Sequence, residues 1–225
     1  MPETVFISIE NLSTEAGTFL TSTWIGIHNG RFDLFDRYRP ASLGLERLAE
    51  DGNADFLSQE FNYQAGLDSL IVGSEKTETV IDPGEIAEIS LELDSDNPNQ
   101  QYLSYVSMLI PSNDAFIANE NSRAIDLFDN DGNLIAGEYI IYGNRLWDAG
   151  TEGNNEDEES TAFAGQEQPN SGVPEGGVVN LHEGYVAGGR LEELYPGSEN
   201  LTALPLNALD NAVADVQNQG FHPYK

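Results

Sequence analysis

Residues 102–114, YLSYVSMLIPSND, form the most strongly β-like segment of the chain. Between Tyr102 and Ile110 it carries apolar side chains on both faces of an extended chain, which favours a strand in the middle of a sheet. The polar run from Pro111 to Asp114 then ends that strand. We therefore expect the rest of the chain to be arranged around a β-sheet.

Strand patterns are found on both sides of this stretch. Thr4 to Glu10 is rich in β-branched and aromatic residues, and Trp24 to His28 is a second such run. After the turn signal DPGE at 82–85, apolar and polar residues alternate from Ala87 to Leu93, which predicts a strand with one face exposed to solvent.

Further strands are predicted in the second half of the chain. Ile125 to Phe128 and Glu138 to Tyr142 flank the turn-forming run Asp129 to Asn133, a pattern typical of a hairpin. Val213 to Gln217 is a candidate closing strand.

Two short helices are predicted near the start. Pro40 suits a first helical position, and an apolar stripe follows from Leu43 to Ala49 before Gly52 ends it. A second helix is predicted from Ala54 to Tyr63. No repeat or linker separates two cores, so we expect residues 1–225 to form a single, mainly antiparallel β-domain with a long acidic, Gly- and Asn-rich loop at about 150–183.

The composition excludes several classes of function. The 225 residues include 39 acidic and 9 basic side chains, a net charge of −30, which disfavours binding to nucleic acid or to anionic membranes and favours cations. There is no cysteine, so disulfides and Cys-ligated zinc are excluded. No apolar run approaches the roughly 18–20 residues of a transmembrane segment. The first residues lack the features of a signal peptide, which leaves open a secreted chain without its signal or a cytoplasmic chain.

Motifs for catalysis are missing. The three histidines, at 28, 182 and 222, are too scattered for a histidine metal motif, and we expect structural or surface roles for them. No Gly-x-Ser-x-Gly elbow and no Gly-rich phosphate loop with a lysine occurs. The EF-hand-like run from Asp129 to Asn133 has Leu134 where the calcium loop requires glycine, so a hairpin turn is the better interpretation.

One acidic loop has the chemistry of a cation site. In LWDAGTE, residues 146–152, small residues allow a tight turn between Asp148 and Glu152. Two carboxylates and nearby carbonyls can serve a hard cation, and calcium takes about six to eight oxygen ligands, so a third carboxylate is expected. Asp114, just after the central strand, is the natural candidate. Two ordinary turns in an acid-rich protein are the alternative.

The chain resembles the spondin-type domain found near the N-termini of F-spondin and mindin and in many bacterial proteins. SMLIPSND, at 107–114, is similar to the family's strand ending in Pro-Ser-Pro-Asp, and WDAGTEG, at 147–153, is similar to its Asp-Ala-Gly-Thr-Asp turn. The opening fits the bacterial branch through IENLS, HNG and LAEDG, at 9–13, 28–30 and 48–52.

This resemblance implies an antiparallel, C2-like β-sandwich that binds Ca²⁺ at one end through Asp114, Asp148 and Glu152. The sequence departs from the family where Ala115 replaces a tryptophan and Glu152 replaces an aspartate, and it lacks the cysteines of the animal proteins. Glu92 is a further candidate ligand, but it would lie far from Asp114 if its strand formed a hairpin with the central strand.

The function expected is that of a non-catalytic, calcium-binding recognition or adhesion module, extracellular or on the cell surface. Its partners would be a metal ion and a glycan, a matrix component or a protein ligand, and Mg²⁺ in place of Ca²⁺ stays open. One alternative is a hydrolase that uses paired carboxylates, which would require a deep, aromatic-lined cleft. Another is a structural protein of a surface or matrix.

Overall fold

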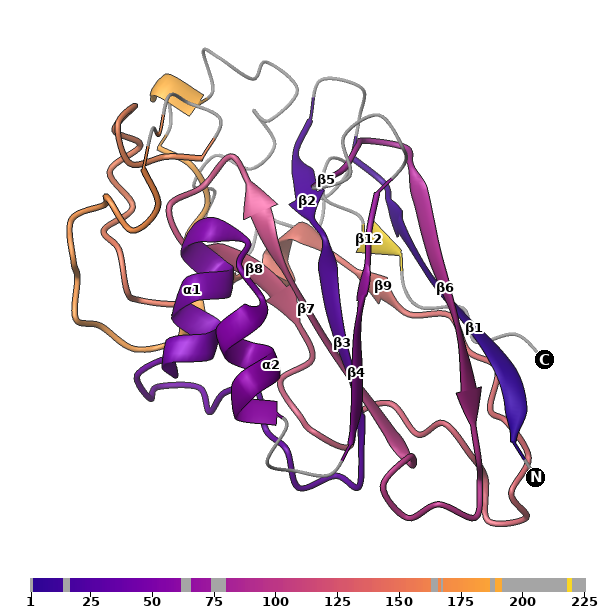
Figure 1. Cartoon of the computed structure of the whole chain (residues 1–225). Helices are drawn as coiled ribbons and strands as arrows, with labels where there is room; N and C mark the ends of the chain where they lie inside the picture. The colour runs from indigo at the N-terminus through magenta and orange to yellow at the C-terminus, as the bar shows by residue number, and fades with distance from the viewer. Residues whose placement is uncertain are drawn as a thin grey trace.

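In the computed structural model, two antiparallel sheets lie face to face as a sandwich (Figure 1). The structure describes residues 2–13, 17–61, 66–73, 80–162, 166, 168–186, 189–191 and 218–219. The smaller sheet has the order β6 (Ile86–Leu93), β1 (Glu3–Asn11), β12 (Asn218–Gln219) and β9 (Ile140–Ile141). This arrangement confirms the predicted mainly β, sandwich-like fold.

The larger sheet contains the central strand. Its main path runs β11 (Asn180–Leu181), β10 (Trp147–Asp148), β8 (Ala115–Ala118), β7 (Tyr102–Ile110), β2 (Phe19–Thr21) and β5 (Val80–Ile81). Off this path, β3 (Thr23–His28) pairs with β7 and with β4 (Leu67–Ile71). A short 3₁₀ helix, η2 (Gly143–Arg145), precedes β10. As predicted, β7 has neighbours on both sides and is buried on both faces.

The two faces of the larger sheet pack against different partners. Ile25 and Leu109 point into the sandwich, where they join Val5 and Ile7 of the smaller sheet in one core. Alternate residues of the same strands, such as Val106, point to the opposite face and form a second core with the helices. Side chains in strands alternate between faces, so one strand serves both cores.

Two helices cover the outer face of the larger sheet (Figure 1). Helix α1 (Leu43–Asp51) is capped by Ser42, whose hydroxyl accepts a hydrogen bond from the Leu45 N–H at 3.2 Å. At its other end it is capped by Gly52, which has a left-handed conformation. The predicted stop at Gly52 is confirmed, whereas the helix begins three residues after Pro40. Helix α2 (Asp55–Phe61) is the second predicted helix, and the prediction for 62–63 falls outside the described residues.

The predicted apolar stripe of α1 was wrong at its first residue. Leu45 and Leu48 are buried against the sheet, but Leu43 is exposed. At 3.6 residues per turn, Leu43 lies about 200° from Leu45 around the helix axis and so points away from the core.

The predicted hairpin around residues 129–133 was also wrong in its second strand. The turn after Phe128 folds the chain onto Leu134 and Ile135, while β9 pairs with β12 instead of completing that hairpin. Strand β6 pairs along its length with β1 and not with the central strand, and its exposed Glu92 accepts a hydrogen bond from the Thr4 hydroxyl at 2.5 Å. The predicted closing strand at 213–217 lies outside the described residues, next to β12.

Candidate functional site

The pairing of β8 with β10 brings Asp114 and Asp148 together. Asp114 immediately precedes β8, and the antiparallel register places Asp148 opposite Ala115. The Ala149 N–H also donates to the Asp114 carbonyl at 3.2 Å, which continues the pairing past the end of the strands. Two carboxylates that are 34 residues apart in the sequence are therefore neighbours at one end of the larger sheet.

A tight turn then returns the chain toward Asp114. Gly150 has a φ of +68°, and a Cβ there would lie 2.6 Å from the backbone nitrogen of Val178, so only glycine fits without a shift of the backbone. After this turn the Thr151 and Glu152 N–H groups both donate to Asp114 Oδ2, at 2.8 and 3.1 Å. The turn thus places Glu152 beside Asp114, whose carboxylate in turn lies near Asp148.

Asp114 is fully buried, and only one of its two carboxylate oxygens accepts hydrogen bonds from the described residues. The Thr151 hydroxyl also donates to Oδ2, at 3.1 Å, whereas Oδ1 has no hydrogen-bond partner among the described residues. Burial raises the pKa of Asp114 to about 6, and the Asp148 carboxylate contributes in the same direction against the N–H donors of Glu152 and Thr151. This environment disfavours the negative charge that the residue carries at neutral pH.

Asp148 is held on both oxygens. Its Oδ1 accepts from the Gly150 N–H at 2.7 Å, and its Oδ2 accepts from the side-chain amide of Asn154. Burial raises the pKa of Asp148, which these two donors oppose and the carboxylates of Glu175 and Glu183 reinforce.

The carboxylate of Glu152 packs closely against the backbone of Gly172. Glu152 is only 2% exposed, and its Oε1 accepts from the Gly172 N–H at 2.7 Å, where a Cβ would lie 2.1 Å from the Glu152 carboxylate. Its Oε2 has no hydrogen-bond partner among the described residues. Burial raises the pKa of Glu152 against the Gly172 N–H, and the Asp114 carboxylate adds to the rise.

A fourth acid, Glu50 on α1, lies near this cluster and was not predicted from the sequence. It is 2% exposed, and burial raises its pKa to about 7, with the Glu152 carboxylate adding to the rise and a hydrogen bond from the Thr151 side chain opposing it. The signal in the sequence was an acid next to Ala49 in the buried stripe of α1, but its neighbours in space could not be inferred from helix periodicity.

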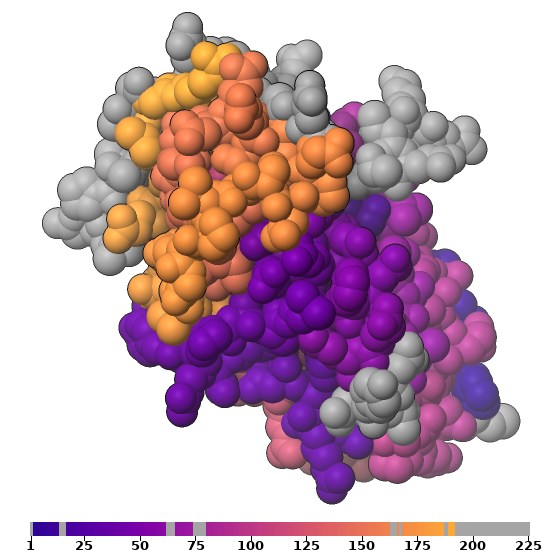
Figure 2. Space-filling model, turned by 60° about the vertical axis from the view of Figure 1, so that its left-hand side comes forward, coloured from indigo at the N-terminus to yellow at the C-terminus, as the bar shows by residue number. Residues whose placement is uncertain are grey.

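The loop after Asp148 packs directly against α1 and the segment before it. Figure 2 shows this loop, in orange, lying on the part of the surface formed by the first helices, in purple. Between them is a pocket of about 440 Å³ lined by Glu50 and Glu152 together with Pro40, Arg47 and several glycines. None of the described residues that line it is aromatic, unlike the cleft that the hydrolase alternative requires.

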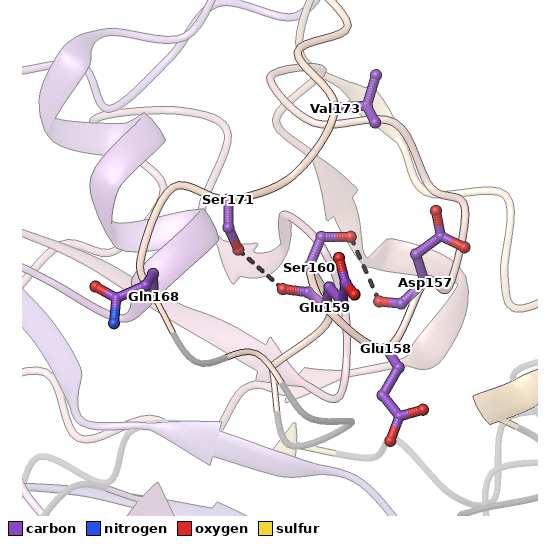
Figure 3. Close-up of a pocket in the computed structure, with 7 residues that line it drawn as sticks. All are labelled: Asp157, Glu158, Glu159, Ser160, Gln168, Ser171 and Val173. Carbon is purple, nitrogen blue, oxygen red and sulfur yellow. Dashed lines mark hydrogen bonds between the residues drawn. The ribbon is translucent and has the colours of Figure 1, made fainter.

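Other acids of the same loop are exposed to water. Figure 3 shows an open pocket of about 950 Å³ in which Asp157, Glu158 and Glu159 surround Ser160, with Gln168, Ser171 and Val173 completing the lining. Glu158 pairs with Arg190 at 2.8 Å, and no carboxylate oxygen here is both buried and without a partner. This pocket is an exposed acidic surface. Asp114, Glu152 and Glu50 differ from it because they are buried and each has an oxygen without a hydrogen-bond partner among the described residues.

Within the part of the chain that the structure describes, no three His, Asp or Glu side chains are already arranged to hold a metal ion. The donor chemistry nevertheless fits a hard cation, because the unpartnered buried atoms of Asp114 and Glu152 are carboxylate oxygens. His182 is a neighbour of Asp114 and stays neutral, since burial lowers its pKa despite the Asp114 carboxylate.

The family of the chain follows from its sequence as well as its fold. The Spondin_N family model matches residues 17–170, more than half of the chain, and the match includes Glu50, Asp114, Asp148 and Glu152. The chain therefore belongs to the Spondin_N family, a family of non-catalytic modules that suggests extracellular recognition or adhesion. No curated protein matches the chain. None of the helices in the described residues has the length and apolar character that a membrane crossing needs.

Proposed function

We propose that this chain is an extracellular or cell-surface recognition module that binds Ca²⁺ through Asp114, Asp148 and Glu152. The observation that supports the proposal most directly is the pair of buried carboxylate oxygens, Asp114 Oδ1 and Glu152 Oε2, that lack a hydrogen-bond partner among the described residues. A buried charged oxygen without a partner is costly, and a bound cation is one of the few groups that satisfies it.

The three residues suit calcium in the type of ligand atom that they supply. All supply oxygen, the ligand atom that Ca²⁺ prefers, and water or backbone carbonyls can complete a flexible shell of about six to eight ligands. The side chains would have to converge by rotation, most of all Asp148, whose two oxygens are bonded to Gly150 and Asn154. Mg²⁺ demands a stricter octahedral geometry, which a loop of this kind supplies less readily.

Calcium would have two effects here, one on the charge of the carboxylates and one on the conformation of the loop. It would neutralise carboxylates that repel one another and hold the loop at 148–152 against the end of β8. The surface around this loop would then be presented in one conformation to a glycan, a matrix component or a protein ligand. Pre-ordering a binding surface in this way reduces the entropy lost on association.

The test is the dependence of thermal stability on free calcium. At a hundredfold excess of calcium over the dissociation constant, binding to the folded state alone adds about 2.7 kcal/mol to the free energy of unfolding. The melting temperature of the wild-type chain should then rise by several degrees relative to a chelator-treated sample. Asp148→Asn should melt near the calcium-free wild type and should not respond to calcium.

Two controls separate the site from the general charge. Sodium chloride at matched ionic strength accounts for screening of the 39 acids. Asp131→Asn removes one charge at an exposed position of the turn after Phe128 and should respond to calcium as the wild type does. A wild-type melting curve unmoved by chelator, or equal responses of Asp148→Asn and Asp131→Asn, would refute the proposed site.

A further inference from the structure

Glu50 occupies a position that should be unfavourable for a carboxylate. It lies in the last turn of α1, where the carbonyl end of the helix repels negative charge, and that turn contains no basic residue. Its side chain is also almost completely buried, and its Oε2 has no hydrogen-bond partner among the described residues. Burial and the helix end therefore act against the same charge.

Arg47 only partly compensates this charge. Its guanidinium forms an ion pair with Glu50 Oε2 at 3.5 Å, but it also lies 3.3 Å from Glu46 and 3.8 Å from Asp51. One positive charge is thus shared among three acids, and it makes no hydrogen bond to Glu50 Oε2. The negative charge around Glu50 is therefore only partly neutralised.

The unpartnered oxygens gather in one place. Four buried side-chain oxygen or nitrogen atoms of the described residues lack a hydrogen-bond partner, and three of these are carboxylate oxygens of Glu50, Asp114 and Glu152. Thr151 links two of these residues, because its hydroxyl donates to the other carboxylate oxygen of Asp114, Oδ2, at 3.1 Å and its side chain also hydrogen-bonds Glu50. A hydroxyl has one proton, so it can donate to only one of these carboxylates at a time.

Glu50 and Glu152 also face the same space. Both line the pocket of about 440 Å³ between α1 and the loop, and the Glu152 carboxylate contributes to the raised pKa of Glu50. A divalent cation in this pocket would supply positive charge to both carboxylates.

We propose that Glu50 is an additional carboxylate of the cation site, so that a bound divalent cation links helix α1 to the loop at 148–152. This inference rests on the proposed function. The linkage would extend the effect of calcium from the loop to α1, which packs on the larger sheet. Calcium would then order the surface formed by the loop together with the helix.

The experiment measures calcium binding to the full chain by isothermal titration calorimetry. Glu50→Gln keeps the shape of the side chain but removes its charge, and it should weaken calcium binding at least about tenfold, the loss expected when a charged ligand of a hard cation is removed. Glu46→Gln is the matched control, because Glu46 lies one turn earlier on α1, lines the same pocket and pairs with the same arginine. It should bind calcium within about threefold of the wild type.

Hydrogen exchange provides a second measurement, and it is informative for the wild-type chain alone. Calcium should slow amide exchange at the C-terminal end of α1, at residues 48–52, in the wild type and in Glu46→Gln but not in Glu50→Gln. If Glu50→Gln fails to fold, as judged by circular dichroism, the wild-type exchange data decide alone: unchanged exchange in α1 on calcium binding overturns the inference.

The outcomes distinguish the two proposals. If the wild type binds no calcium, the proposed function fails and the role of Glu50 fails with it. If the wild type binds calcium and Glu50→Gln binds it as tightly as Glu46→Gln, only the role of Glu50 is overturned. Weaker binding by Glu50→Gln alone, together with calcium-dependent protection of α1, supports the inference.

Discussion

His28 illustrates how a single buried side chain sets its own protonation. It is fully buried, its Nδ1 accepts from the Gly30 N–H at 2.9 Å, and its Nε2 lies 2.9 Å from the Ser104 hydroxyl. Nδ1 is therefore unprotonated, and Nε2–H donates to Ser104. Phe32 and Phe61 pack around the ring, and burial lowers the pKa of His28 to about 4. The structural role expected from the sequence fits this environment.

We predict that His28 makes the fold sensitive to acid. Its folded-state pKa of about 4 lies below its ordinary value of 6.5, so the unfolded chain binds the proton more readily between these two values. The stabilising contribution is complete above pH 6.5 and is lost as the pH falls toward 4. An NMR titration of the ring should give a midpoint near 4 in the folded chain and near 6.5 in urea. A midpoint near 6.5 in the folded chain would contradict this assignment.

At the scale of elements, two glycines in turns have similar backbones and different surroundings. Gly52 ends α1 with a φ of +68°, and Gly84 follows Pro83 in the turn before β6 with a φ of +78°. A Cβ on Gly52 would lie 2.7 Å from the Thr21 Cγ2, whereas a Cβ on Gly84 would have no atom within 4 Å. The first glycine is required by both conformation and space, and the second by conformation alone.

This difference predicts unequal costs for the same substitution. Gly84→Ala should lower the free energy of unfolding by about 1–2 kcal/mol, the cost of a left-handed backbone for an L-residue. Gly52→Ala should cost more because of the contact with Thr21, and Thr21→Ser in the same chain should recover part of the difference. Urea unfolding of the three variants measures these costs. Equal losses for Gly52→Ala and Gly84→Ala would show that the contact with Thr21 is unimportant.

For the whole molecule, charge is the dominant property. A net charge of −30 on 225 residues makes the folded state repel itself, because folding brings the acids closer together. The acids of the loop after Asp148 lie next to others on α1, as the pocket between them indicates. The repulsion is therefore expected to be greatest on the side that carries the candidate site.

Sodium chloride should accordingly stabilise the fold at neutral pH. Raising its concentration from about 0.01 M to about 0.1 M shortens the Debye length from about 30 Å to about 10 Å, so distant acids repel one another less. The melting temperature should rise in the wild type and equally in Asp148→Asn, since screening does not depend on the site. A melting temperature that falls or stays constant over this range would show that repulsion among the acids does not limit stability.

The sequence by itself determined the features that depend on neighbouring residues. The alternation in β6, the two-sided burial of β7, the end of α1 at Gly52 and the turn between Asp148 and Glu152 all follow from side-chain periodicity and turn chemistry within a few residues. The family motifs around Asp114 and Asp148 are equally local. This is why the class of fold follows from the sequence, and why the sequence also proposes Asp114, Asp148 and Glu152 as candidate ligands.

Only the tertiary structure decided which segments meet. The pairing of β6 with β1 depends on which strand edges lie close in space, and hydrogen bonds between strands are the same whichever sequences they join. The position of Glu50 beside this loop was decided for a similar reason. Helix periodicity identifies a face, but the loop that covers this face comes from about 100 residues later in the chain. The structure also shows that the acids near Asp114 are buried, whereas those around Ser160 are exposed. Composition cannot predict this difference, because it arises only when folding excludes water from some side chains.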